Sequence, residues 1–437
     1  MRHETLRREF LQATTAGLAA GLMTAGAART ARAANERLTV GLIGCGGRGT
    51  RDASLFQKVP GVALAYVCDV DEGRRELAAK ALGVPAEKAV GDLRRVLDDK
   101  AVDLVIVATP DHWHSPAAIL ACDAGKHVYV EKPISHNLRE GRLLVEAAQR
   151  NQRLVQHGTQ CRSTPMMIEA VKLLRQGIIG EVLSAKCWNI QRREPLPPGQ
   201  DVQPPAGFDY DTWLGPAPVI PYRTNRVHHR WTMWYHFGAG EAGNDGVHDI
   251  DYARWGLGVE GHPHKITAPG GKYFFRDEQE FPDTQQATFE YLGDGAPGSR
   301  RMLIYEQRLW TTNYPHQCDS GAEFYGTRGQ MFLSRRGKIE ILGDRNKPLD
   351  VQVRPGPQDD ALHVANLCAA IRGEAKQTAD ALTGHLSTSL AHLANIATRV
   401  GRSLTFDPAK EEIVGDAEAG ALLRREYRTH WGTPKNV

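Results

Sequence analysis

The chain has 437 residues, too many for one hydrophobic core, so two or more domains are expected. Hydrophobic residues make up 41% and charged residues 24%, which is typical of globular proteins and excludes a disordered or membrane-embedded chain. The net charge of +3 gives no argument for nucleic acid as a partner. Residues 1–33 hold five Arg and two acids, and subtracting them from the totals of 54 and 51 leaves 49 of each sign.

The first 33 residues have the order of parts that is typical of an export signal. Arg7 and Arg8 stand before a mildly apolar run (13–28), and Ala31-Arg32-Ala33 matches a cleavage site. The paired arginines resemble the twin-arginine signal, which the twin-arginine export machinery recognises on folded proteins. We therefore expect a periplasmic protein, or a cytoplasmic one if the segment is a retained helical arm. No later run reaches about 18 apolar residues, so no membrane span is expected.

The stretch RLTVGLIGCGGRGT (37–50) predicts a buried strand, a glycine loop and the start of a helix. Its Gly44-x-Gly46-x-x-Gly49 pattern allows a tight turn, a close approach to a pyrophosphate, and close packing of the helix on the strand. The predicted cofactor loop comprises Gly44, Cys45, Gly46, Gly47, Arg48 and Gly49.

A second strand (62–71) contains Asp69, which lies 20 residues beyond Gly49. A carboxylate at this place accepts hydrogen bonds from the ribose hydroxyls and repels a 2′-phosphate. No Arg follows Asp69 directly. The pattern therefore favours NAD over NADP.

Helical and strand-like segments continue to alternate after Asp69, which predicts a doubly wound parallel sheet over residues 36–160. The expected strands are 103–110, 127–133 and 153–158, and the expected helices are 76–83, 115–125 and 137–150. The expected helix 115–125 has Ser115 as a plausible N-cap and Pro116 at the first helical position. The ligand should lie at the carboxyl ends of the strands.

The pattern changes after residue 160. A helix (164–177) and a strand (181–190) precede a long segment rich in proline and aromatic residues (194–237), and such a loop is usually functional. Strand-like runs alternate beyond residue 264, and residues 359–400 return to helical spacing. Trp231, Trp234 and Tyr235 could stack on sugar faces, with Arg226, His228 and His229 bonding hydroxyls. The aromatic residues could equally fill a core or a subunit contact.

Seven cysteines occur without any C-x-x-C pair, and several lie in apolar runs. We therefore expect buried free thiols rather than a disulfide framework. His228, His229, His236, His248 and Asp251 could act as metal ligands, but they show no compact spacing such as H-E-x-x-H. No metal is therefore predicted.

At TPDHWH (109–114) and EKP (131–133) the sequence resembles the Gfo/Idh/MocA family, which includes glucose–fructose oxidoreductase and inositol dehydrogenase. Further matches are QHGTQCRS (156–163), YDTWLGPAPVIPYR (210–223), GNDGVHDIDYARWGLG (243–258) and HVANLCAAIRG (363–373). The resemblance covers the chain after the signal and is closest to the exported, twin-arginine branch. It implies an α/β fold with an N-terminal Rossmann domain (36–160) and a C-terminal α+β domain (161–437). The second domain would have a large open, mostly antiparallel sheet and a helical tail (363–437), and would assemble a homodimer or homotetramer.

The resemblance also implies roles for particular residues. Lys132 would lie near the nicotinamide, where an ammonium stabilises the alkoxide that precedes hydride transfer. Besides the glycine loop and Asp69, the implied cofactor contacts are Thr109, Pro110, His112, His114, Glu131, Lys132 and Gln160. The implied substrate contacts are Arg162, Arg226, Trp231, Tyr235, Asn244 and His248. Lys132, His248 and Asn244 are the expected catalytic set.

The stretch GNDGVHDID (243–251) departs from the pattern D-x-G-x-H-x-x-D that the family usually carries. Asn244 stands where the first Asp is expected, while His248 and Asp251 match. Asp245 is displaced by one residue, so its side chain should point elsewhere. Because an amide does not ionise, Asn244 is expected to position substrate rather than to act as a base. Asp249 is interpreted as a surface acid and Asp251 as a structural partner of the loop.

Three functional hypotheses follow. The first is an NAD-dependent oxidoreductase acting on a sugar, sugar derivative or polyol. The second is a redox-cycling glycosidase, lyase or epimerase that releases no net NADH, which suits a tightly bound NAD in a periplasm without free cofactor. The third is a non-catalytic carbohydrate-binding protein on a relic dehydrogenase fold.

Overall fold

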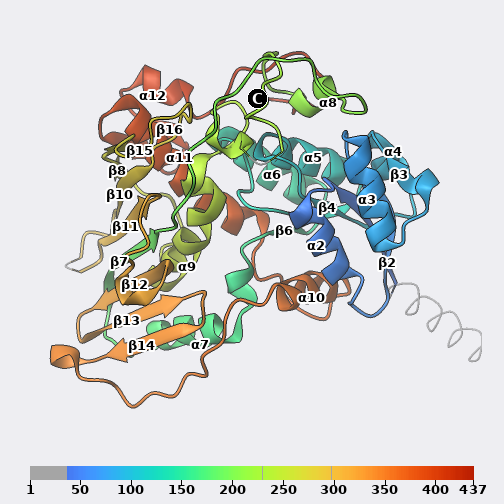
Figure 1. Ribbon diagram of the computed structural model, residues 1–437. Helices are drawn as coiled ribbons and strands as arrows, with labels where there is room; N and C mark the ends of the chain where they lie inside the picture. Colours follow the sequence, from blue (N-terminus) through green and yellow to red (C-terminus); the bar gives the residue numbers. More distant parts are fainter. Residues whose placement is uncertain (1–36, 229, 297) are drawn as a thin grey trace, which may run out of the picture.

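The computed structural model describes residues 37–228, 230–296 and 298–437, so the predicted export signal lies outside the described residues. Two β-sheets divide the chain (Figure 1). The first belongs to the N-terminal part, with helices on its faces, and the second lies beside it with helices packed against one face. Within these residues no helix combines the length and the apolar character needed to cross a membrane.

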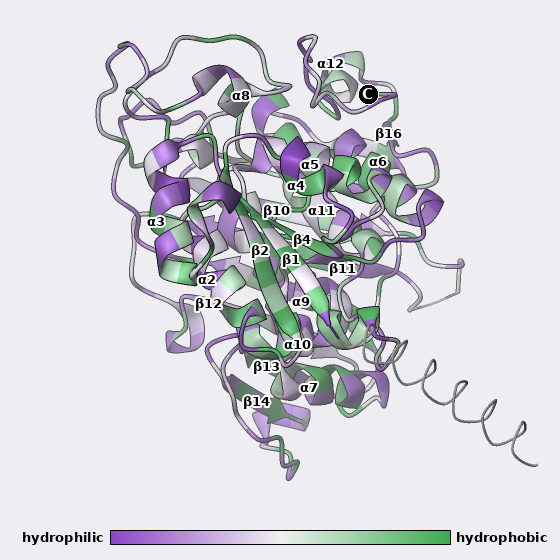
Figure 2. Ribbon diagram, turned by 90° about the vertical axis from the view of Figure 1, so that its right-hand side faces the viewer, coloured by the Kyte–Doolittle hydropathy of each residue, from purple (hydrophilic) through white to green (hydrophobic). Residues whose placement is uncertain are grey.

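The first sheet has six parallel strands in the order β3-β2-β1-β4-β5-β6, the doubly wound arrangement that the sequence predicts. The strands are β1 Leu38–Ile43, β2 Val62–Cys68, β3 Ala89–Val90, β4 Leu104–Val107, β5 His127–Val130 and β6 Val155–His157. The helices are α2 Gly47–Phe56, α3 Glu72–Leu82, α4 Arg94–Asp98, α5 Asp111–Asp123 and α6 Leu138–Arg150, with a 3-10 turn at Ala86–Lys88. All four residues of β4 are buried, and Figure 2 shows the apolar strands β1, β2 and β4 at the centre.

Helix α5 begins earlier than predicted. It starts at Asp111 rather than after Ser115, and Pro116 lies inside it. Proline has no N–H to give to the carbonyl four residues before it, which here belongs to His112. Arg425 donates to that carbonyl instead, with Nη2 2.8 Å from the oxygen. A contact from the far end of the chain therefore allows a proline inside the helix.

The second sheet has ten strands in the order β14-β13-β12-β7-β11-β10-β8-β15-β16, with β9 paired to β10. The strands are β7 Val182–Asn189, β8 Lys265–Thr267, β9 Gly270–Gly271, β10 Thr284–Tyr291, β11 Arg301–Arg308, β12 Ser320–Gly326, β13 Gly329–Ser334, β14 Lys338–Leu342, β15 Leu404–Asp407 and β16 Glu412–Ile413. Only the β7–β11 pair is parallel among these pairings, so the sheet is mostly antiparallel as expected.

The second part of the chain contributes further helices. They are α7 Pro165–Arg175, α8 Tyr210–Leu214, α9 Val247–Leu257, α10 Asp360–Ile371, α11 Ala381–Val400 and α12 Ala417–Ala421, with 3-10 turns at Gln160–Ser163, Trp231–Met233, Pro315–Gln317 and Asp344–Asn346. A π-helical turn, Ala242–Gly246, leads directly into α9. Helix α9 contacts β7 and β12, and α11 lies between α9 and α6.

The C-terminal tail is not wholly helical, which corrects the prediction for residues 363–437. Helix α10 packs on α2 of the first domain, and its Val364 and Leu367 join that domain's core (Figure 1). Beyond α11, Leu404 and Phe406 are buried in β15, which pairs with β8 at the sheet edge. The alternation of buried and exposed positions in LTFD has the period of a strand.

All seven cysteines are buried free thiols, as the sequence predicts.

Candidate active site

The glycine loop between β1 and α2 has the geometry that its sequence predicts. Gly44 has φ +97°, and a Cβ there would lie 2.5 Å from the carbonyl carbon of Ala108. A Cβ on Gly49 would lie 2.0 Å from the Gly44 carbonyl oxygen. A Cβ on Gly47 would meet no atom of the described residues within 4 Å, so the middle of the loop is open to a ligand. These features fit a dinucleotide pyrophosphate.

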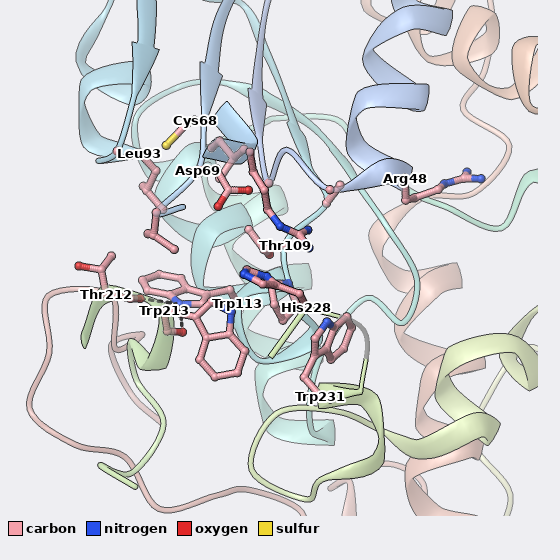
Figure 3. Close-up of a pocket in the computed structure, with 18 of the residues that line it drawn as sticks. Arg48, Cys68, Asp69, Leu93, Thr109, Trp113, Thr212, Trp213, His228 and Trp231 are labelled. Carbon is pink, nitrogen blue, oxygen red and sulfur yellow. Dashed lines mark hydrogen bonds between the residues drawn. The ribbon is translucent and has the colours of Figure 1, made fainter. Parts of the chain in front are cut away.

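A cavity of about 290 Å³ opens in front of this loop (Figure 3). Its walls come from the glycine loop, the ends of β2 and β4, and the aromatic segment around α8 and residue 231. The lining residues are Ile43, Gly44, Gly46, Gly47, Arg48, Cys68, Asp69, Val70, Arg74, Gly91, Leu93, Ala108, Thr109, Pro110, Trp113, Thr212, Trp213, His228 and Trp231. Besides Asp69 and residues of the glycine loop, the predicted cofactor contacts Thr109 and Pro110 lie in its wall. Cys45 stands behind the wall and donates its N–H to Asp69.

Asp69 occupies the place expected for the ribose partner. Its carboxylate accepts from the N–H of Cys45 at 2.7 Å and of Asp71 at 3.0 Å. Burial raises its pKa, while these two bonds favour the charged form. Arg74, from the first turn of α3, also lines the cavity. The sequence offered no arginine directly after Asp69, and Arg74 lies five residues further on, where α3 brings it to the cavity wall.

Three tryptophans and a histidine form the far wall of the cavity (Figure 3). Trp113 donates its Nε1–H to the Trp213 carbonyl at 3.0 Å. His228 lies with Nε2 2.9 Å from an Asp71 carboxylate oxygen, which ties the aromatic segment to the end of β2. Trp231 was predicted as a substrate contact but lines this cofactor-side cavity. Trp113 and Trp213 were missed, although both stand inside quoted motifs, TPDHWH and YDTWLGP.

His112 and His114 do not line the cavity, which corrects their prediction as cofactor contacts. His112 Nε2 lies 2.7 Å from the Trp213 carbonyl oxygen. His114 bridges the carbonyls of Pro133 and Thr109, at 2.6 and 2.8 Å. Burial lowers the pKa of His112 to about 3, so it is neutral. Because α5 already begins at Asp111, both rings turn inward and brace the site instead of facing it.

Arg48, Glu131 and Gln160 form a polar network next to the cavity. Arg48 Nη2 lies 2.8 Å from Glu131 Oε1, and the same oxygen accepts from Gln160 Nε2 at 3.0 Å. Burial would raise the pKa of Glu131, but Arg48 and Lys132 bring it down to about 2. Arg48 also pairs with Asp360 at the start of α10, at 3.1 Å. The network therefore joins the cofactor loop, the end of β5 and the C-terminal part of the chain.

The predicted catalytic residues meet at the end of β5 and the start of α9. The Lys132–Pro133 peptide bond is cis. Lys132 Nζ donates to the backbone carbonyl of Asn244 and to its Oδ1, the latter at 3.1 Å. His248 is buried, and its Nδ1 has no hydrogen-bond partner within the described parts of the chain. Burial, Arg335 and Lys132 lower its pKa, so the imidazole is neutral and able to accept a proton.

Asp245 bonds to partners other than Lys132, as its displacement by one residue predicted. Its carboxylate pairs with Arg335 at 2.7 Å, with Arg193 at 3.4 Å and with Gln191. Its charge raises the pKa of His248, opposing the arginine. The chain forms a π-helical turn over Ala242–Gly246, in which Asn244 faces Lys132 and Asp245 faces Arg335.

Asp249 and Arg162 also differ from expectation. Asp249 was expected on the surface but is fully buried. Its carboxylate accepts a hydrogen bond from the Tyr252 hydroxyl at 2.6 Å, and burial raises its pKa to about 7. Arg162 Nε lies 2.8 Å from Asp251 Oδ2 in a buried ion pair, so its guanidinium is engaged and is not a substrate contact. Asp251 thereby has the structural role that was predicted for it.

Arg226 and Tyr235 lie apart from Lys132 and the cavity. Arg226 stacks over the Trp234 ring, 4.5 Å from its centroid, and donates to the Pro221 carbonyl at 3.1 Å. Tyr235 packs edge-on against Phe281 with ring centroids 4.5 Å apart. These contacts are internal, in line with the alternative that the aromatic segment fills a core. His229 lies outside the described residues.

A cluster that the sequence did not suggest brings His262, His385 and Glu411 together, with one ligand atom from each within 4.8 Å of the others. The Nε2 atoms of His262 and His385 lie 2.7 and 2.9 Å from the same Glu411 oxygen. Arg142 pairs with this carboxylate as well. The arginine already supplies a positive charge there, so the cluster is most simply a clamp between α6, α11 and the β15–β16 turn.

Comparison with known families accounts for most of the chain. A family described as "Oxidoreductase family, NAD-binding Rossmann fold" matches residues 38–159. Its companion, "Oxidoreductase family, C-terminal alpha/beta domain", matches residues 191–278 and 316–433. Fold and site thus define an oxidoreductase with an NAD-binding Rossmann domain. The chain belongs to the Gfo/Idh/MocA family, as its motifs predicted.

Two curated relatives illustrate the chemistry found among similar chains. The chain is 28% identical over 306 residues to scyllo-inositol 2-dehydrogenase (NAD(+)) of Bacillus subtilis (strain 168), covering 68% of this chain and 74% of the relative. It is 31% identical over 209 residues to an alpha-N-acetylgalactosaminidase of Shewanella oneidensis, covering 41% of this chain and 45% of the relative. The second match thus spans less than half of the glycosidase.

Solved structures share the fold at low identity. The aldose-aldose oxidoreductase of Caulobacter crescentus has a TM-score of 0.65 at 17% identity, covering 85% of this chain and all of that chain. A levoglucosan dehydrogenase in complex with NADH and levoglucosan has a TM-score of 0.63 at 18% identity, covering 84% and 99% of the two chains. At this identity the likeness establishes the fold alone.

Proposed function

We propose that the protein oxidises or reduces a sugar, sugar derivative or polyol at a hydroxyl or carbonyl carbon, with NAD as cofactor. The observation that carries this proposal is the junction of β5 and α9. There Lys132 is held by Asn244, and the unpartnered Nδ1 of the neutral His248 lies on the next helical turn. Alcohol oxidation needs a proton acceptor and a group that stabilises the alkoxide, and a neutral imidazole and an ammonium can supply these two functions.

The residues divide the work as follows. NAD supplies the hydride acceptor or donor when bound. Lys132 donates a hydrogen bond to the substrate oxygen and stabilises negative charge on it. His248 Nδ1 accepts the hydroxyl proton as the O–H bond breaks, and returns it in the reverse direction. Asn244 holds the ammonium through its Oδ1 and does not itself take up a proton.

A panel of sugars and polyols tests this proposal. The purified protein is incubated with each compound and NAD, and reduced nicotinamide is followed by absorbance. We expect turnover of at least one compound, with loss of activity in His248→Ala and retained NAD binding. A substrate turned over equally well by His248→Ala would contradict the role of this residue.

A second candidate is the redox-cycling glycosidase, lyase or epimerase. The glycosidase relatives favour it, as does the aromatic wall of Trp113, Trp213 and Trp231 over the cofactor cavity, which would slow cofactor exchange. Product formation without stoichiometric NADH would support cycling, whereas one NADH per product would support net oxidation. Mass spectrometry of cofactor released from the purified protein would test whether NAD is tightly held.

The biological setting is proposed from the sequence. Residues 1–33 would direct the chain through the twin-arginine machinery to the periplasm, and the mature protein would be a homodimer or homotetramer. Replacing Arg7 and Arg8 by Lys should leave the precursor uncleaved in the cytoplasm. Sedimentation of the mature chain would measure its assembly, and a monomer at micromolar concentration would contradict it.

A further inference from the structure

Glu241 is a buried carboxylate to which the reaction described above gives no role. It stands directly before the π-helical turn Ala242–Gly246, and its side chain is 1% exposed. Arg193 donates to its Oε1, from Nε at 3.0 Å and from Nη2. The same arginine lies 3.4 Å from a carboxylate oxygen of Asp245. Because a buried charge is stable only when charged or hydrogen-bonding partners meet it, these contacts hold Glu241 in one position.

The other oxygen of Glu241 meets Asn244. Glu241 Oε2 accepts from Asn244 Nδ2 at 3.3 Å, and on the far side of the amide Asn244 Oδ1 accepts from Lys132 Nζ at 3.1 Å. A carboxylate only accepts hydrogen bonds and an ammonium only donates them. The two partners together therefore allow one orientation of the amide, with its oxygen towards Lys132 and its NH2 group towards Glu241.

The orientation of this amide determines how Lys132 is held. An ammonium has three N–H donors, and Lys132 directs two of them at the backbone and side-chain oxygens of Asn244. The third remains for a substrate oxygen. If the amide turned over, its NH2 group would face the ammonium, donor against donor, and the direction of the third N–H would no longer be fixed.

We propose that Glu241 is a positioning residue for the reaction, which acts through Asn244 to direct the third N–H of Lys132 at the substrate oxygen. This inference rests on the role that the proposed function gives to Lys132. Glu241 itself takes up no proton and binds no substrate. Since orientation of a catalytic group acts on the chemical step, its loss should lower kcat rather than raise KM.

Glu241→Gln tests the proposal, because it keeps the shape of the side chain and replaces one acceptor by an NH2 group. Arg193 is charged and makes the stronger bond, so it should keep the remaining oxygen. The new NH2 group then faces Asn244 and turns its amide over. We expect kcat to fall at least about tenfold, with KM and the Kd for NAD within about threefold. Glu87→Gln, at an exposed position of the 3-10 turn Ala86–Lys88, is the matched control and should change neither.

A second substitution separates orientation from damage to the fold. In Glu241→Gln/Asn244→Asp, the aspartate can accept from the new NH2 group with one oxygen and from Lys132 with the other. In Asn244→Asp alone, two carboxylates oppose each other. Glu241→Gln should therefore lower kcat when position 244 is Asn, and leave it unchanged or raise it when position 244 is Asp. An equal loss in both backgrounds would overturn the proposal.

Acetylation of Lys132 provides a readout that needs no substrate. The full chain is treated with limiting acetic anhydride, and mass spectrometry compares the modification of Lys132 with that of the exposed Lys80 in the same sample. An NH2 group in place of the amide oxygen disfavours the ammonium, so Glu241→Gln should acetylate Lys132 at least about threefold faster, and the double variant should return to the wild-type rate. This pattern without turnover of any sugar would refute the proposed reaction and still support the orientation by Glu241. Labelling that Glu241→Gln leaves unchanged would overturn the positioning role.

Discussion

The cofactor loop and the start of α9 are the two regions of the proposed active site, and their geometry has different origins. At the loop, each glycine acts through its own backbone: Gly44 has a positive φ and Gly49 allows the helix to pack close to the strand. At α9, the position of Asn244 depends on Lys132 from the other domain, and that of Asp245 on Arg335 from β13's end. The first region is therefore local in sequence and the second is assembled from distant segments.

Removing the ammonium of Lys132 should have the largest effect on activity, and it should show whether the start of α9 and the cofactor loop act independently. For Lys132→Met we expect kcat/KM to fall about 10²- to 10⁴-fold, because a charge that stabilises the substrate oxygen is lost. The Kd for NAD should stay within about threefold, since Lys132 bonds to Asn244 and not to the glycine loop. Steady-state kinetics and NAD titration measure both quantities. The exposed Lys80→Met is the control, and a parallel loss of NAD affinity in Lys132→Met would show that the regions are not separable.

The preference for NAD or NADP tests the region of the cofactor loop, whose geometry is local in sequence. Asp69→Ser should weaken NAD about 10- to 100-fold, through lost bonds to the ribose hydroxyls, and improve NADP, because Arg74 remains in the cavity wall. Fluorescence titration with each cofactor measures the change. The double variant Asp69→Ser/Arg74→Gln should lose the gain for NADP. If it keeps that gain, Arg74 is not the group that receives the 2′-phosphate.

Replacing Asn244 by the aspartate that the family usually carries tests the region at the start of α9. In Asn244→Asp, a carboxylate beside His248 should raise the pKa of this imidazole. Since the neutral imidazole accepts the proton, the acidic limb of the kcat/KM profile should move to higher pH, by about one unit. A pH–rate profile unchanged by the substitution would count against any part for position 244 in catalysis. Asp98→Asn, on α4, serves as a distant control.

The smallest expected effect is on the pH dependence of the free energy of unfolding, through Asp111 at the start of α5. Burial raises the pKa of Asp111 to about 8, against the opposing charge of Lys132. The folded state therefore binds this proton more tightly than the unfolded state does, and the contribution to stability falls as pH rises from about 4 to about 8. Asp111→Asn keeps an acceptor for the Ala239 N–H and should flatten that slope. Urea unfolding at about pH 5 and about pH 8 compares the two proteins, and equal slopes would mean that Asp111 is ionised throughout.

The export signal, the doubly wound sheet and the cofactor loop were predicted from the sequence; the sheet was confirmed, and the glycines of the loop have the backbone geometry that was predicted. They could be predicted because strand periodicity and glycine spacing are local properties. The errors lie where distant segments compete. His112 and His114 were interpreted as cofactor contacts, but α5 begins five residues earlier than predicted, and Arg425 takes the carbonyl that Pro116 leaves free. Arg162 was interpreted as a substrate contact, but Asp251 on α9 pairs with it in the core.

By itself, the sequence determined the family and the NAD-binding domain, since these follow from short motifs, and it predicts Lys132 and His248 as partners in one site. Only the tertiary structure decided that Trp113, Trp213 and Trp231 wall the cofactor cavity and that Asp245 turns towards Arg335. The physical reason is that ion pairs and aromatic contacts join residues far apart in the chain, and no local spacing encodes which of the available partners a buried charge will take.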